Sequence, residues 1–119
     1  LYVPLLDNDF LVLDLARWLN LPVLVVARPG LGTINHTVMT VKTVEQAGLP
    51  VVGVIFNQYP ANPNLAARTN PQIIAAISGR PILAQVPVID DLSGPGGREI
   101  LLASLAPVLA SPAWRQFFS

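Results

Sequence analysis

The stretch LPVLVVARPGLGTINHT, residues 21–37, decides the fold of this chain. Its apolar run Val23–Ala27 is rich in β-branched residues and is typical of a buried strand. The segment Pro29–Gly32 holds two glycines, which permit a tight turn and a close approach of a ligand to the backbone. An amphipathic helix then opens at Thr33, and its first N–H groups form a natural site for an anion. The stretch contains neither GxGxxG nor GxxxxGK(S/T), so it is not a standard phosphate-binding loop.

Two later segments repeat this arrangement of strand and helix. Pro22, Pro50 and Pro81 each precede a short apolar run, which is a position where a strand tolerates proline. The runs are Val23–Ala27, Val51–Phe56 and Ile82–Val86. Helical patterns lie between them, so we expect an α/β fold with a parallel sheet and helices on both faces. Ligands of such sheets bind at the carboxyl ends of the strands.

The helices are predicted from apolar periodicity and from their end signals. Asp9 is the expected cap of a first helix, Gly48 the stop of a second, and the pair Asn70-Pro71 the start of a third that ends at Gly79. The expected ranges are Phe10–Leu19, Thr33–Ala47, Asn70–Gly79 and Arg98–Ala106. Residues 1–110 are expected to form the domain. The tail 111–119 is expected to pack on the sheet as a helical turn or to contact a partner.

The composition excludes several classes of protein. Only 12% of the residues are charged and 52% are hydrophobic, and the net charge is zero. This predicts that part of the surface is covered by further chain or by a second subunit. The alternative is a domain that is simply rich in core residues. No apolar run is long enough for a membrane span, and the start lacks the features of a signal peptide. The absence of cysteine excludes disulfides, and a single histidine argues against a zinc site. No basic or aromatic-basic stripe indicates nucleic-acid binding.

The segment LPVLVVARPGLGTINHTVMTVKTVEQAGLPVVGVIFN, residues 21–57, resembles the dethiobiotin synthetase family. The strand, the LGTINHT turn, the helix and the strand that ends in asparagine follow in the family's order. The resemblance extends over about residues 1–91 through four shorter matches: Leu1–Leu5, Asp14–Ala16, Arg68–Pro71 and Gln85–Pro87. The LGTINHT motif is fairly specific, whereas many P-loop relatives share the strand-helix-strand context.

The resemblance implies a P-loop NTPase-like fold, a cytoplasmic homodimer and an ATP-dependent reaction. Such enzymes use ATP, Mg²⁺ and CO₂ to close a ureido ring on 7,8-diaminononanoate in biotin synthesis. By resemblance, the carboxylate of the diamine is received, across the dimer interface, by five residues: Leu31, Gly32, Thr33, Ile34 and Asn35. Asn57 reads the adenine, with Gln58 beside it, and the adenine and ribose are bordered by Val86, Pro87, Val88 and Asp91.

Each of these sites also has an ordinary structural interpretation. Thr33 could cap its helix, Asn57 could form an Asx-turn, and the segment 86–91 could be a plain strand end. His36, and Thr37 with it, is expected to pack or to make an interface hydrogen bond. Arg28 is expected to be solvated or at an interface. The pair Lys42 and Glu45 is expected on a solvated helix face.

The chain also departs from the family. The phosphate loop, the lysines and the metal-binding carboxylates of the family would precede Leu1, so we expect an N-terminally truncated domain with an open sheet edge that self-associates. Asp7, Asp9 and Asp14 are not expected to bind metal, and no catalytic residue is assigned. Two alternatives stay open. One is a part of a cobyrinic acid a,c-diamide synthase-type amidotransferase, and the other is a non-catalytic interaction module or gene fragment.

These departures predict that the 119-residue polypeptide does not make dethiobiotin by itself, because no lysine-bearing loop in it can hold the phosphates of ATP. The measurement is an assay of the purified chain with ATP, bicarbonate and 7,8-diaminononanoate. Formation of dethiobiotin with multiple turnovers would contradict the prediction.

Overall fold

The centre of the molecule is a three-stranded parallel sheet in the order β3-β4-β5. The computed structural model describes residues 1–118, and Ser119 of the tail lies outside the described residues. The strands are β3 (Val23–Ala27), β4 (Val51–Tyr59) and β5 (Ile82–Pro87). Every residue of β4 from Val51 to Phe56 is buried, which explains the unbroken apolar run. The predicted parallel α/β sheet is confirmed, and β4 extends beyond the predicted end.

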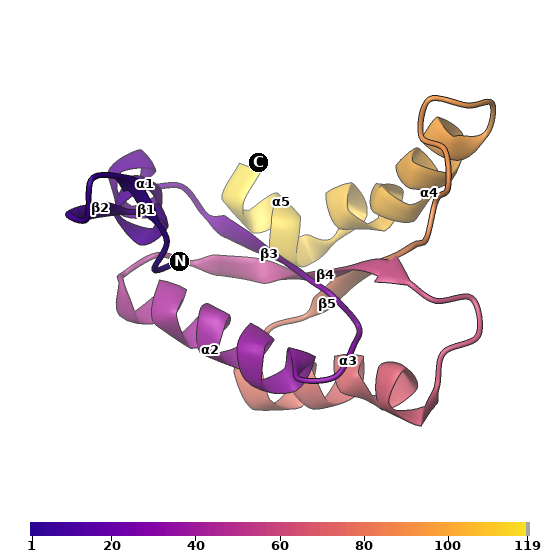
Figure 1. Cartoon of the computed structure of the whole chain (residues 1–119), viewed down its shortest axis with the longest axis horizontal. Helices are drawn as coiled ribbons and strands as arrows, with labels where there is room; N and C mark the ends of the chain where they lie inside the picture. The colour runs from indigo at the N-terminus through magenta and orange to yellow at the C-terminus, as the bar shows by residue number, and fades with distance from the viewer. Residues whose placement is uncertain (119) are drawn as a thin grey trace.

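Helices cover both faces of this sheet, as predicted (Figure 1). One face carries α2 (Thr33–Gln46) and α3 (Leu65–Ser78), and the other carries α4 (Gly97–Ala110) and α5 (Pro112–Phe118). The larger apolar core lies beneath α2 and α3 and includes the fully buried side chains of Val41, Val44, Phe56 and Ile74. A smaller core joins Ile55, Ala84, Val86 and Val108 beneath α4, and Trp114 of α5 packs against it.

The first residues form a small lobe that the sequence did not predict as strands. It contains an antiparallel ribbon of β1 (Pro4–Leu6) and β2 (Phe10–Leu11), followed by α1 (Val12–Leu19). The prediction that Asp9 caps this helix is wrong, because Leu11 is the N-cap residue. The carboxylate of Asp14, inside the first turn, accepts a hydrogen bond of 2.8 Å from the backbone N–H of Leu11. The helix therefore begins after Leu11. Among residues 1–118, no three His, Asp or Glu side chains are grouped so as to hold a metal ion.

The start of α3 also differs from the prediction. Asn64 caps the helix, and its Oδ1 accepts a hydrogen bond of 2.9 Å from the N–H of Ala67. Pro71, expected at the first position, lies inside the helix and cannot donate to the carbonyl of Ala67 one turn earlier. The hydroxyl of Tyr59 donates to that carbonyl instead, at 2.8 Å. A side chain from the end of β4 thus supplies the bond that proline removes, and the helix continues through Pro71.

The predicted stop of α2 at Gly48 is confirmed. Gly48 has φ of 84° and follows the helix as predicted. Its N–H donates to the carbonyl of Glu45, and the N–H of Leu49 donates to that of Val44, which is a Schellman closure. The expected solvated role of Glu45 is wrong, because its carboxylate is half-buried and pairs with Arg80 Nε at 2.6 Å. This ion pair joins the last turn of α2 to the segment after α3.

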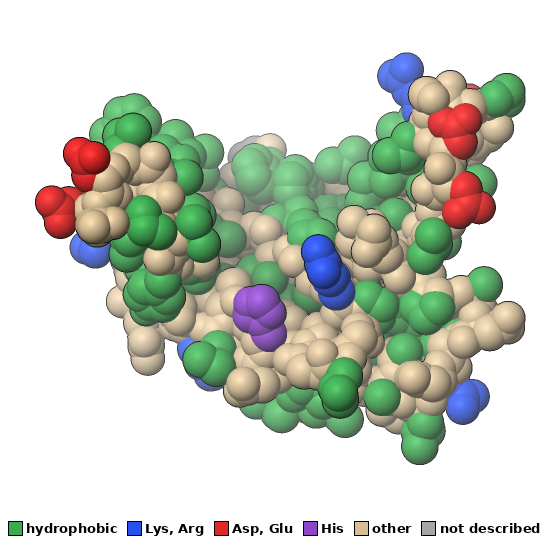
Figure 2. Space-filling view, in the orientation of Figure 1, with side chains coloured by type: hydrophobic (Ala, Val, Ile, Leu, Met, Phe, Trp, Pro, Cys, Tyr) green, Lys and Arg blue, Asp and Glu red, His purple; other side chains and the backbone are tan. Residues whose placement is uncertain are grey.

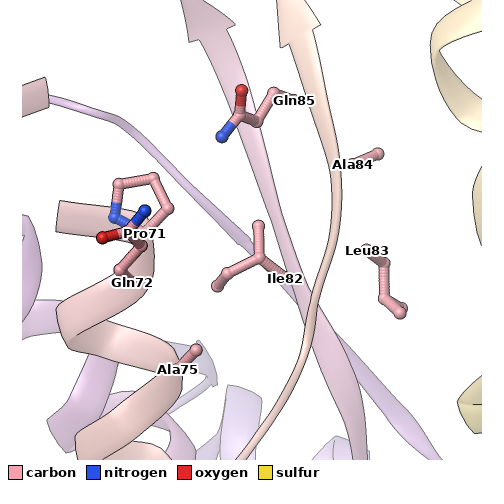
Figure 3. Close-up of a pocket in the computed structure, with 7 residues that line it drawn as sticks. All are labelled: Pro71, Gln72, Ala75, Ile82, Leu83, Ala84 and Gln85. Atoms are coloured by element: carbon pink, nitrogen blue, oxygen red, sulfur yellow. The ribbon is translucent and has the colours of Figure 1, made fainter. Parts of the chain in front are cut away.

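The outer edges of β3 and β5 have no strand partner within residues 1–118. Val26 on β3 is 62% exposed, and Figure 2 shows apolar side chains spread over much of one face. A hollow of about 470 Å³ follows the outer edge of β5, with Ile82 and Gln85 on the side toward α3 (Figure 3). No helix among the described residues is long and apolar enough to cross a membrane.

Close packing of β4 on β5 gives a test of this fold. A Cβ added at Gly53 would lie 2.8 Å from Leu83 Cγ and 2.8 Å from the carbonyl oxygen of Pro81. We expect Gly53→Ala to lower the free energy of unfolding by about 1–3 kcal/mol, because the strands must move apart. Gly30→Ala is the matched control, since no heavy atom lies within 4 Å of its added Cβ. Equal stability of the two variants in urea denaturation would contradict the strand packing.

Candidate functional site

Parallel pairing brings three of the predicted site segments to the carboxyl end of the sheet. Ala27 at the end of β3 lies opposite Phe56 in β4, and Tyr59 at the end of β4 lies opposite Pro87 in β5. The glycine turn after β3 and Asn57, in the last residues of β4, therefore lie at the same carboxyl end of the sheet. Ligands of open parallel sheets bind at this end.

The glycine turn ends in a helix N-terminus that no side chain caps. Gly32 is the N-cap residue, at φ 84°, and no side-chain hydrogen bond caps the helix. The interpretation of Thr33 as the cap is wrong, because its buried hydroxyl pairs with that of Thr37 at 3.1 Å. Both hydroxyls are thereby turned to each other, and the first backbone N–H groups of α2 have no side-chain acceptor. Such a terminus attracts an anion.

Two cavities flank this turn. One, of about 720 Å³, is lined by the edge of β3, by the turn and by the first turns of α2, including Thr33. Arg28 and His36 are exposed and line this same cavity, and Figure 2 shows the histidine on the open face. The other cavity, of about 460 Å³, lies toward α3 and is lined in part by Leu31, Gly32, Ile34 and Asn35. Each of the five predicted carboxylate-binding residues therefore lines at least one cavity.

His36 is expected to pack or to make an interface hydrogen bond. Its side chain is exposed beside the turn, so it is not packed in this chain, and the interface hydrogen bond stays a prediction. Arg28, which lines the same cavity, places a positive charge near the positive end of the α2 dipole. The cavity is therefore suited to an anionic group.

Asn57 lines a third, apolar cavity of about 620 Å³ between the sheet and α4. Its Oδ1 accepts a hydrogen bond of 2.9 Å from the N–H of the next residue, Gln58, whose φ is 56°, whereas an Asx-turn bonds the N–H two residues on. The cavity walls include Val26, Val86 and Trp114. Val26, on the outer strand β3, also lines the 720 Å³ cavity, although α2 and α4 cover opposite faces of the sheet (Figure 1).

The remaining predicted nucleotide residues are placed less directly. Gln58, Pro87, Val88 and Asp91 are not among the residues that line the apolar cavity. The carboxylate of Asp91 accepts hydrogen bonds from Ser93 Oγ at 2.7 Å and from Ser93 N–H at 3.0 Å. These bonds, the hydroxyl bond first, hold the pKa of Asp91 below its ordinary value of 3.8. The structure thus brings Asn57 and Val86 together and shows Asp91 organising its own loop.

Two residues of this edge were missed by sequence reasoning. Asn70 is buried, and its Nδ2 donates to the carbonyl of Pro29, at 3.4 Å and 41 positions away. Tyr59 connects the end of β4 to α3 through the carbonyl of Ala67. No local pattern signals a contact of this kind, since Asn before Pro reads equally well as a helix cap.

Comparison with known proteins identifies what this arrangement is similar to. A family model described as AAA domain matches residues 1–96. The ATP-dependent dethiobiotin synthetase of Bacillus licheniformis is 42% identical over 88 residues, covering 74% of this chain and 37% of that protein. The enzyme of the same name from Bacillus subtilis is 43% identical over 88 residues, covering 74% and 38%. That of Parafrankia sp. is 40% identical over 105 residues, covering 87% and 44%. The chain thus spans about two fifths of the length of these relatives.

The Asp91 loop gives a prediction that pH can test. A carboxyl with a lowered pKa keeps its hydrogen bonds above its unfolded pKa and loses them as the pH falls through its folded pKa. We expect Ser93→Ala to raise the pKa of Asp91 toward 3.8, because the hydroxyl donor is removed. Carboxyl NMR titration measures the change, with Ser104→Ala on α4 as the control. A pKa that Ser93→Ala leaves unchanged would show that the hydroxyl does not hold this carboxylate.

Proposed function

The chain belongs to the AAA domain family, and on that premise we propose that it forms the carboxylate-binding and adenine-binding part of an ATP-dependent dethiobiotin synthetase. The relatives that carry this name support the assignment. The proposed reaction closes a ureido ring on 7,8-diaminononanoate with CO₂ and ATP. We propose that the working assembly is a cytoplasmic homodimer.

One observation carries the proposal. The uncapped N-terminus of α2 and the amide of Asn57 lie at the same carboxyl end of the sheet, and Val26 of β3 lines the cavity beside each of them, one cavity toward α2 and the other toward α4. In a ligase of this type the sites serve two ligands, the diamine and the nucleotide, which must meet for reaction.

The proposed carboxylate site uses the backbone of Leu31–Asn35. An anion at a helix N-terminus is stabilised by about 0.3–2 kcal/mol, depending on its burial. Arg28 lines the adjoining cavity and strengthens the local positive potential, and His36 lines it as well. A long aliphatic acid can place its carboxylate here and extend its chain along the apolar edge of β3, where Val25 and Val26 line the same cavity.

The proposed adenine site uses Asn57. A carboxamide can donate to N7 of adenine and accept from its N6 amine. The Oδ1 of Asn57 already accepts one bond from Gln58, but an amide oxygen has a second lone pair, and Nδ2 remains a donor. Val86 and Trp114 supply apolar wall for the ring. Gln58, Pro87, Val88 and Asp91 are proposed to border the adenine and ribose from outside this cavity.

Phosphate and metal chemistry is not supplied by the residues described. The 119 residues contain no GxxxxGK(S/T) segment, and residues 1–118 group no three carboxylate or imidazole side chains for a metal ion. The donor set therefore does not fit Mg²⁺, and no step is assigned to it within this chain. The contribution of these residues is to bind and orient the diamine and the nucleoside.

The carboxylate site can be tested by adding negative charge. Asn35→Asp places a charge in the first turn of α2, where it stabilises the helix but repels an anionic ligand. We expect the affinity for 7,8-diaminononanoate to fall about twofold to fivefold, as measured by NMR titration. Gln46→Glu, which adds the same charge at the other end of α2, should leave the affinity unchanged.

The methyl ester of the diamine acid is the matched ligand control, because it lacks the negative charge. Both variants should bind the ester as the original chain does. Equal losses of acid binding in Asn35→Asp and Gln46→Glu would overturn the assignment of the carboxylate to this helix end.

A further inference from the structure

We propose that Asn70 is a positioning residue, which holds the Pro29–Gly32 turn in the shape that receives the carboxylate. The inference rests on the proposed function, since it concerns the same anion site. Asn70 reaches the turn from α3 and does not belong to the segment that contacts the ligand. It acts through the backbone of the turn.

The geometry of Asn70 supports this role. Its side chain is only 6% exposed, and its Nδ2 donates to the carbonyl of Pro29 at 3.4 Å. It also lines the 460 Å³ cavity together with Gly32 and Asn35. A buried amide without a hydrogen-bond partner costs free energy. This cost favours the conformation in which the amide of Asn70 stays bonded to the turn.

A second hydrogen bond, close to Asn70 in α3, also holds this helix in place. Pro71 follows Asn70 and frees the carbonyl of Ala67, and the hydroxyl of Tyr59 donates to that carbonyl at 2.8 Å. Tyr59 lies at the end of β4, two residues after Asn57. The middle of α3 is therefore held to both predicted ligand segments, through Asn70 to the turn and through Tyr59 to the strand end.

The turn itself has few restraints of its own. Pro29 has no N–H to donate, and Gly30 and Gly32 have the largest conformational freedom of any residue type. Within the turn, the N–H of Thr33 donates to the carbonyl of Gly30, at 3.2 Å. A donor on the carbonyl of Pro29, just before the glycines, restricts the unbound turn and reduces the entropy that a ligand must otherwise remove.

The test compares two asparagines of α3. Asn70→Ala removes the donor to the turn, whereas Asn64→Ala removes the cap of the same helix and leaves the turn untouched. We measure amide hydrogen exchange of residues 30–35 without ligand, and the affinities of the 119-residue chain for 7,8-diaminononanoate and its methyl ester. If Asn70→Ala does not fold, Asn70→Ser replaces it, because its hydroxyl can bond within α3 but is too short to reach Pro29.

We expect Asn70→Ala to accelerate exchange in residues 30–35 and to weaken binding of the acid about threefold to tenfold, with less effect on the ester. Asn64→Ala should lower stability without either change. Equal exchange in the two variants, or equal affinity for the acid, would overturn the inference. If the original chain binds no acid, the proposed function fails, and the exchange rates still decide whether Asn70 holds the turn.

Discussion

The parallel pairing of β3 with β4 is the constraint from which the rest of the molecule follows. Ala27, the last residue of β3, lies opposite Phe56, so the glycine turn begins level with Asn57 near the end of β4. The pairing is held by burial, because β4 is covered on both faces from Val51 to Phe56. A shift of one position in this register would reverse the faces of the apolar side chains and separate the glycine turn from Asn57. The site is therefore a consequence of how the core is buried.

The sequence predicted the elements whose signals are local. The strand Val23–Ala27, the glycine after α2 and the parallel α/β architecture follow from β-branched runs, from backbone freedom and from the spacing of strands and helices. The start of α3 was wrong because Asn70-Pro71 matches a helix start equally well, and the bond that permits proline inside the helix comes from Tyr59. The short strands β1 and β2 lack the alternation of apolar and polar residues that predicts a strand. A local sequence pattern cannot show a hydrogen bond from a distant residue such as Tyr59, nor a short strand pairing with an irregular register.

The sequence predicted which segments lie near one another at this end of the sheet, but not which hydrogen bonds their side chains make. Sequence placed Gly32 and Asn57 at a common edge, and the structure agrees. It did not show that the hydroxyls of Thr33 and Thr37 pair, or that Asp91 uses its carboxylate on Ser93. In each case a polar side chain forms a bond within its own segment, in the first turns of α2 for Thr33 and Thr37 and in the loop after β5 for Asp91. Preformed loops of this kind lower the entropy cost of binding.

The contact between Asn70 and Pro29 joins a side chain to a main-chain carbonyl. Every amino acid carries that carbonyl, so replacing residue 29 leaves the acceptor in place as long as the backbone path is kept. The donor exists only while residue 70 is an asparagine or a similar amide. In evolutionary terms, the contact makes the two positions unequal: it tolerates substitution at position 29 while it restrains change at position 70, in a helix far along the chain.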